Sequence, residues 1–294
     1  MGRHLDRAKA YVGRDVSGLL EGGRYSLVHT RSLEFDDLRP YVPGDDVRDI
    51  DWKATARSGN VLIKRFVSEK HHKILVVADA GRNTAGLSPS GEVKREVAAN
   101  VIGALGLITL PRSDEIGMVF GDGRGCVDIR LRRGETHLEY MLQRYLDHAC
   151  DHPGRSDVVT QLRWVAEHYR HRHLVVVVSD EPEVDDRLDE LLTRLAARHD
   201  VMWAMTVDHP AIAGPDDPMD ADVVGYDVAD GATVLGRTDL GRDVIAAYEE
   251  AERARREALY ESMTAHAVPY ALIAGSRGIR RGLIGMTGVL ARAG

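Results

Sequence analysis

Four apolar runs of strand length constrain the fold of this chain more than any other feature. They are residues 74–79 (ILVVAD), 174–178 (LVVVV), 201–207 (VMWAMTV) and 268–273 (VPYALI). Segments of helical length separate them. Apolar runs without alternation are typical of strands buried on both faces, as in a parallel sheet covered by helices. The pattern therefore predicts an α/β fold with a mostly parallel sheet and helices on both faces.

The segments between and around these runs complete the expected sheet domain, residues 73–294. Two alternating segments joined by GDGRG, residues 115–120 and 126–131, predict a hairpin with an antiparallel edge strand. Segment 208–243 holds nine Asp and three Pro, and predicts a long acidic connection with a short strand near 223–228 or 233–235. Helices are expected over 90–110 (with Ser90 as N-cap), 135–148, 157–169, 185–198, 243–265 and 278–293.

Residues 1–72 are expected to form a small N-terminal subdomain around a charged platform. Residues 33–65 carry seven acidic and six basic side chains, together with apolar residues at intervals. Such a segment is too charged for a core element and too apolar for a disordered tail. We expect an amphipathic helix within 1–20, a strand at 24–30 and an edge strand at 60–66. We expect Arg48, Lys53 and Arg57 to pair with Asp45, Asp49 and Asp51.

The platform has two open interpretations, ion pairs that hold it to the sheet domain or a surface for a partner protein. Exposed Arg and Trp side chains are common anchors of interfaces. Catalysis by its carboxylates is the least favoured interpretation. The predicted interaction residues are Asp45, Asp46, Arg48, Asp51, Trp52 and Arg57 on the platform, and Arg82 after the first strand of the sheet domain.

Composition excludes several classes of protein. The net charge is −7 and the pI is about 6.0, which argues against nucleic acid as a partner. The two cysteines, Cys126 and Cys150, have no metal-binding spacing, and reduced thiols are expected. No run of 18 apolar residues and no apolar signal core occur, so the sequence predicts no membrane span and a cytoplasmic location. P-loop, G-x-S-x-G and H-E-x-x-H motifs are absent.

Polar residues at the ends of the expected strands mark the candidate site. Ligands of open α/β sheets bind outside the carboxyl ends of the strands. Asp79 ends the first strand, Asp180 follows the strand at 174–178, and Thr136 begins the helix after the hairpin.

This order resembles the von Willebrand factor type A fold, whose metal-ion-dependent adhesion site uses an Asp-x-Ser-x-Ser loop, a distal Thr and a distal Asp. The resemblance implies a degenerate site for Mg²⁺, which favours oxygen ligands. Gly81 and Asn83 replace the two serines, and Gly81 offers no ligand. The implied metal residues are Asp79, Asn83, Thr136 and Asp180. The alternative is that Asp79 and Asp180 only cap loops.

The platform resembles a more specific signature. Residues 31–59, RSLEFDDLRPYVPGDDVRDIDWKATARSG, are similar to the signature of the bacterial domain-of-unknown-function family 58, which directly precedes a von Willebrand type A-like domain. Typical members of that family resemble membrane-anchored proteins whose genes neighbour those of MoxR-type AAA+ ATPases, which implies a shared role in protein maturation or remodelling. The resemblance implies a non-enzymatic interaction adaptor for such an ATPase and an unknown client protein. The alternatives are a metal-dependent hydrolase or a metal-dependent adhesion module that uses Asp79 and Asp180.

Overall fold

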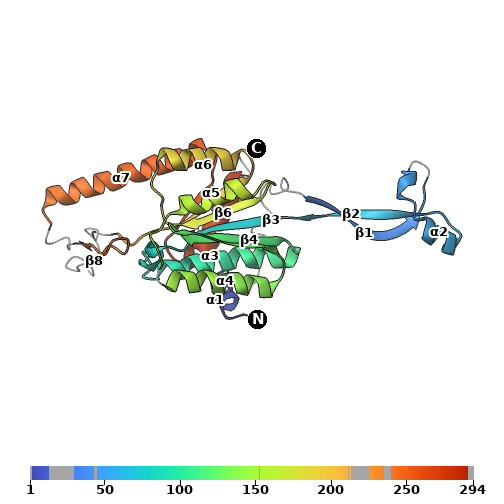
Figure 1. Ribbon diagram of the computed structural model, residues 1–294, viewed down its shortest axis with the longest axis horizontal. Coiled ribbons are helices and arrows are strands. Elements are labelled where there is room, and N and C mark those ends of the chain that lie inside the picture. Colours follow the sequence, from blue (N-terminus) through green and yellow to red (C-terminus); the bar gives the residue numbers. More distant parts are fainter. Residues whose placement is uncertain are drawn as a thin grey trace. The chain divides into compact units, whose positions relative to one another are not determined.

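The computed structural model describes residues 2–12, 30–42, 45–151, 153–210, 212, 225–234 and 240–290. The chain divides into two compact units (Figure 1). One consists of residues 29–72, the hairpin unit, and the other of residues 1–28 and 73–294, the α/β unit. Of the strand expected at 24–30, only Thr30 lies within the described residues. Much of the acidic connection at 208–243 also lies outside them.

The α/β unit is built on a six-stranded sheet. Its strands are β3 Lys73–Asp79, β4 Glu115–Asp122, β5 Gly125–Arg132, β6 Leu174–Ser179, β7 Asp200–Thr206 and β10 Tyr270–Ile273. Their order across the sheet is β10-β7-β6-β3-β4-β5. All neighbouring pairs are parallel except β4 and β5, which form the expected antiparallel hairpin at one edge. The four apolar runs become β3, β6, β7 and β10, as the pattern of strands buried on both faces predicts.

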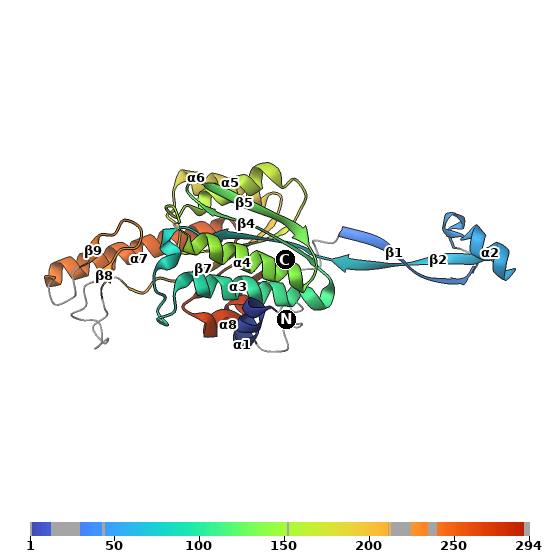
Figure 2. The ribbon, with the colours of Figure 1, turned by 60° about the horizontal axis from the view of Figure 1, so that its bottom comes forward.

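Helices cover both faces of this sheet, as expected (Figure 2). Successive side chains of β3 point to opposite faces. Ile74 and Val76 pack in one apolar core, and Leu75 and Val77 in the other. The first core lies under α1 Arg3–Val12, α3 Lys94–Thr109, α4 Glu135–Cys150 and α8 Ile279–Leu290, and the second under α5 Val158–His168, α6 Asp186–Ala196 and α7 Arg242–Ala265.

The amino-terminal helix α1 belongs to the α/β unit, which corrects the boundary expected at residues 1–72. Its Leu5 is fully buried in the first core. The backbone N of His4 donates to Glu139 Oε1 over 2.9 Å, and Arg7 forms an ion pair with Glu96. An apolar stripe on a short helix is stable only where it is buried, and α3 and α4 supply that cover.

The hairpin unit consists of two long antiparallel strands and the segment that connects them. Strand β1 Thr30–Pro40 pairs with β2 Leu62–His71, so the strand expected at 60–66 starts later and runs further. A short 3-10 helix, η3 Val47–Asp49, and helix α2 Trp52–Ser58 lie between them. We call residues 41–61, which join β1 to β2, the tip segment (Figure 1).

The start of α3 differs from the expected one. Ser90 is not its N-cap, because the helix begins at Lys94 after Val93. The Ser90 hydroxyl instead donates to Glu92 Oε2 over 2.7 Å within the preceding loop. A short strand pair, β8 Gly225–Tyr226 and β9 Thr233–Val234, lies in the described part of the acidic connection. Among the described residues, no helix has both the length and the apolar content needed to cross a membrane.

Candidate functional site

Three carboxylates follow three adjacent strands of the sheet, all at its carboxyl edge. Asp79 ends β3, Asp180 comes directly after β6, and Asp208 comes two residues after β7. Asp79 and Asp180 were identified from the sequence, but Asp208 was missed. The signal for Asp208 was the same as for the other two, an apolar strand followed by an acidic residue.

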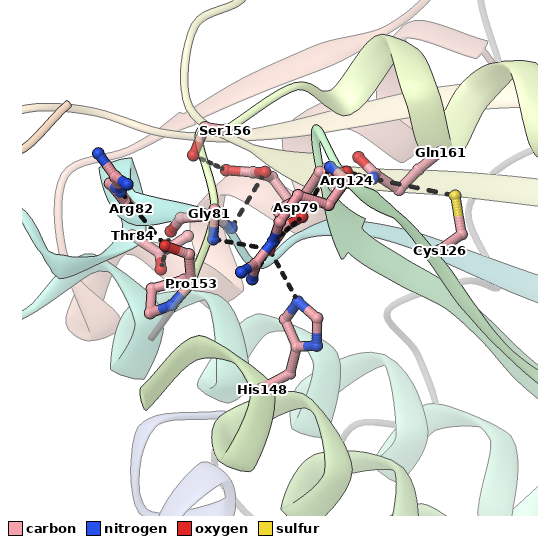
Figure 3. Close-up of polar contacts among 12 residues, drawn as sticks. Asp79, Gly81, Arg82, Thr84, Arg124, Cys126, His148, Pro153, Ser156 and Gln161 are labelled. Atoms are coloured by element: carbon pink, nitrogen blue, oxygen red, sulfur yellow. Dashed lines mark hydrogen bonds and ion pairs between the residues drawn. The ribbon is translucent and has the colours of Figure 1, made fainter. Parts of the chain in front are cut away.

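Asp79 is almost completely buried, with an exposed fraction of 1%. Its Oδ1 accepts a hydrogen bond from the Gly81 backbone N over 3.2 Å, and its Oδ2 accepts one from Ser156 Oγ over 2.6 Å (Figure 3). Burial and the charge of Asp180 raise the pKa of Asp79 to about 7, against the two hydrogen bonds and Lys94, which lower it. The protonated form of this carboxyl group is therefore favoured far more in the folded protein than in an exposed aspartate.

A second buried carboxylate, Asp122 at the end of β4, holds the loop that carries Ser156. Asp122 Oδ2 accepts hydrogen bonds from the Gly154 backbone N over 2.7 Å and from Arg124 Nη2 over 2.6 Å. His148 Nε2 lies 3.3 Å from the same oxygen (Figure 3). Burial alone would raise the pKa of Asp122, but the hydrogen bonds from Arg124 and Gly154 lower it far below its usual range. This contact places Ser156 beside Asp79.

Thr136, predicted as a metal ligand, lies near the amino ends of the parallel strands, away from the carboxyl edge that carries Asp79. Strand β5 is antiparallel to β4, and Arg132 near its end pairs with Ile116 near the start of β4. The neighbouring His137 ring N contacts the Ile116 carbonyl oxygen over 2.9 Å. The prediction is wrong because an antiparallel strand returns the chain to the amino ends of the parallel strands. Ser156, which follows α4, is the hydroxyl that meets Asp79.

Lys94, the first residue of α3, brings a positive charge to the carboxyl edge. Its side chain is only 1% exposed, and its Nζ lies 3.5 Å from Asp180 Oδ2 and in direct contact with Asp208 Oδ1. Asn83, on the short 3-10 helix η4 Arg82–Ala85, donates from Nδ2 to the same Asp180 oxygen over 2.8 Å. Lys94 was not identified from the sequence. A signal was present, because a lysine in the first turn opposes the helix dipole.

These residues do not fit Mg²⁺. The Lys94 ammonium contacts the Asp180 carboxylate that would bind the metal ion. A Cβ atom at Gly81 would lie 2.5 Å from Ser156 Cα, so the loop has no room for a serine ligand there. The described part of the chain also contains no group of three or more His, Cys, Asp or Glu side chains placed to hold a metal ion. The set Asp79, Asn83, Thr136 and Asp180 predicted from the resemblance is thus corrected.

The tip segment of the hairpin unit presents large apolar side chains to solvent. Trp52 is 68% exposed, Val47 61%, Val42 55% and Val61 43%. Lys53 and Arg57, which share α2 with Trp52, are also exposed. The tip thus combines an exposed indole ring with cations, a composition that is enriched in protein interfaces.

Two of the predicted platform carboxylates organise the tip. The Asp45 carboxylate forms a bidentate salt bridge with the Arg39 guanidinium, with N–O distances of 2.7 and 2.8 Å. It also accepts a hydrogen bond from the Val42 backbone N. Among the described side chains its partner is Arg39 rather than the expected Lys53 or Arg57. Asp51 is the N-cap of α2 and accepts from the Ala54 backbone N over 2.9 Å.

The remaining predicted interaction residues are divided between the two units. Asp46 and Arg57 are exposed on the hairpin unit, while the side chain of Arg48 lies outside the described side chains. Arg82 is exposed in the α/β unit, where its Nε donates to the Pro153 carbonyl oxygen over 3.3 Å (Figure 3).

The α/β unit has the mostly parallel sheet, the antiparallel edge strand and the helices on both faces that the sequence predicted. The chain belongs to the family described as "Protein of unknown function DUF58", whose model matches residues 37–258. The match includes most of the hairpin unit and the sheet as far as α7.

Similar proteins include uncharacterized proteins of Mycobacterium bovis and Mycobacterium tuberculosis, each 25% identical over 206 residues. The matched region covers 70% of this chain and 64% of each relative. An aerotolerance-related membrane protein from Bacteroides fragilis matches with a TM-score of 0.45 and 11% identity, over 71% of this chain and 95% of that chain. A von Willebrand factor type A protein from Catenulispora acidiphila matches with a TM-score of 0.42 and 10% identity, over 79% of this chain and 45% of that chain.

Proposed function

We propose that this protein is a non-enzymatic interaction adaptor that works in the cytoplasm with a MoxR-type AAA+ ATPase on a client protein. The exposed apolar tip of the hairpin unit is the observation that carries the proposal. Four exposed large apolar side chains lie within residues 42–61, and a partner that covers them would remove their apolar surface from water. The ATPase is proposed as that partner because of the family signature at residues 31–59, which includes most of the tip segment.

The internal contacts of the tip support this role. The Arg39–Asp45 pair, the Asp51 cap and a hydrogen bond from the Leu62 backbone N to Thr55 Oγ1 stabilise the described part of the segment, residues 41–42 and 45–61. A surface that is ordered before binding loses less conformational entropy on association. Asp45 and Asp51 then shape the surface, and Trp52 makes the contact.

Trp52→Ala is expected to weaken binding of the ATPase by roughly 30-fold, because a central aromatic anchor contributes about 2 kcal/mol. The stability of the protein should change little, since the side chain is mostly exposed. Biolayer interferometry between the purified full chain and a MoxR-type ATPase with bound ATP measures the affinity. Circular dichroism melting measures the stability.

Tyr226→Ala is the matched control, because Tyr226 is a 72% exposed aromatic residue of the α/β unit. This variant should bind as the unmodified chain does. Unchanged affinity of Trp52→Ala, or no complex with the ATPase at micromolar concentration, would contradict the proposal.

The alternative functions, a metal-dependent hydrolase or adhesion module, need a cation beside Asp79 and Asp180. A third carboxylate would favour the hydrolase, and Asp208 is one. Lys94, however, contacts both Asp180 and Asp208. Phosphoester hydrolysis in the presence of Mg²⁺ or Mn²⁺, lost in Asp79→Ala, would favour this alternative.

A further inference from the structure

At the carboxyl edge of the sheet, one positively charged side chain contacts two negatively charged ones. The Lys94 ammonium lies between Asp180, whose side chain is 14% exposed, and Asp208, whose side chain is 57% exposed. Asn83 Nδ2 neutralises part of the remaining charge on Asp180 through a hydrogen bond. The third carboxyl group, Asp79, is held by Ser156 and Gly81.

We infer that the Lys94 ammonium takes the place and the charge of a divalent cation at this edge, so that the α/β unit functions without a bound metal. The ammonium contacts Asp180, one of the two carboxylates beside which a cation was expected, and the neighbouring carboxylate of Asp208. A side chain supplies its charge permanently, whereas a metal ion would supply it only when bound. This role of Lys94 is independent of the partner proposed above.

Neither helix propensity nor burial explains why a lysine stands at this position. A cation in the first turn is unfavourable with the helix dipole. A lysine is almost never fully buried unless it is paired, because desolvation of its charge costs several kcal/mol. The contacts with Asp180 and Asp208 offset both costs. The role of Lys94 is therefore electrostatic, and its target is the pair of carboxylates.

An ordinary structural ion pair and a cation substitute differ in how the site behaves once the lysine is removed. In both cases Lys94→Ala loses stability, because two carboxylates remain without their counter-charge. Only a cation substitute leaves behind a position where Mg²⁺ or Mn²⁺ binds carboxylate oxygens and several waters. Lys94→Ala should therefore gain a divalent site that the unmodified chain does not have.

Titration calorimetry and thermal melting of the full chain with Mg²⁺ or Mn²⁺ test the inference. We expect no binding and no shift in Tm for the unmodified chain or for Lys53→Ala, which removes an exposed lysine. Lys94→Ala should show a lower Tm, bind one equivalent of Mn²⁺ and recover Tm when Mn²⁺ is added. The double variant Lys94→Ala/Asp180→Asn should lose this binding.

Divalent binding by the unmodified chain that Asp180→Asn abolishes would overturn the inference. The same holds for a folded Lys94→Ala that neither binds Mn²⁺ nor recovers Tm. If Lys94→Ala does not fold, Lys94→Gln keeps most of the side-chain length and a hydrogen-bond donor without the charge. Lys94→Gln should bind Mn²⁺, and a failure to bind would count against the inference equally.

Discussion

Asp79→Asn is expected to become more stable relative to the unmodified chain as the pH rises from 5 to 8. The pKa of Asp79 is about 7 in the folded protein, against an ordinary value of 3.8. An acid with a raised pKa favours folding below its unfolded pKa and loses that advantage as the pH rises through its folded pKa. Because the pKa is raised in the folded protein, the stability difference between variant and unmodified chain should grow by a few kcal/mol between pH 5 and pH 8.

Urea denaturation of both proteins at several pH values measures this difference, in which the titration of groups remote from Asp79 cancels. Asp122→Asn is the matched control, because Asp122 is also a buried carboxylate but has a lowered pKa. Asp122 is ionised above pH 5 in both the folded and the unfolded protein, so the stability difference of Asp122→Asn should change much less than that of Asp79→Asn over the same range. A constant difference for Asp79→Asn would mean that Asp79 is ionised in the folded protein.

Gly81→Ser, which restores a serine of the Asp-x-Ser-x-Ser pattern, is expected to destabilise the protein by about 3 kcal/mol. The new Cβ would lie 2.5 Å from Ser156 Cα and 2.6 Å from Ser156 N. Backbone atoms are the obstacle, so a change of side-chain rotamer does not relieve the contact. The loop that carries Ser156 is also held by Asp122 and Arg82, whose backbone N donates to the Gly154 carbonyl oxygen over 2.8 Å.

Thermal and urea unfolding of Gly81→Ser measure the loss. Gly278→Ser is the control, since a Cβ at Gly278 has no heavy atom within 4 Å, and it should unfold as the unmodified chain does. A Gly81→Ser variant of full stability would show that the loop around Ser156 moves aside easily. A serine ligand would then be sterically possible at this position.

Much of the α/β unit could be predicted because its elements depend on local pattern. Buried strands contain continuous apolar residues, and the GDGRG turn between residues 120 and 126 marked the hairpin correctly. Boundaries were less accurate. Ser90 has the chemistry of an N-cap, but its hydroxyl bonds Glu92 and the helix begins four residues later.

The candidate site could be predicted only in part. Asp79 and Asp180 were found because parallel strands bring their carboxyl ends to one edge. Thr136 was misplaced because one antiparallel strand reversed the direction of the chain. Ser156 and Lys94 come from a loop and a helix start, and their sequence separation from Asp79 does not indicate proximity. The charged platform was recognised from its sequence, yet the Arg39–Asp45 partnership depends on how β1 meets the tip.

The fold class, the family and the two acidic strand ends could be read from the order of residues alone, because periodicity and short motifs are properties of neighbouring residues. The behaviour of those acids depends instead on tertiary contacts. Burial raised the pKa of Asp79, the loop after α4 brought Ser156 to it, and α3 placed Lys94 against Asp180. Electrostatic energies depend on distance and solvent exposure in three dimensions, and the order of residues along the chain specifies neither of them directly.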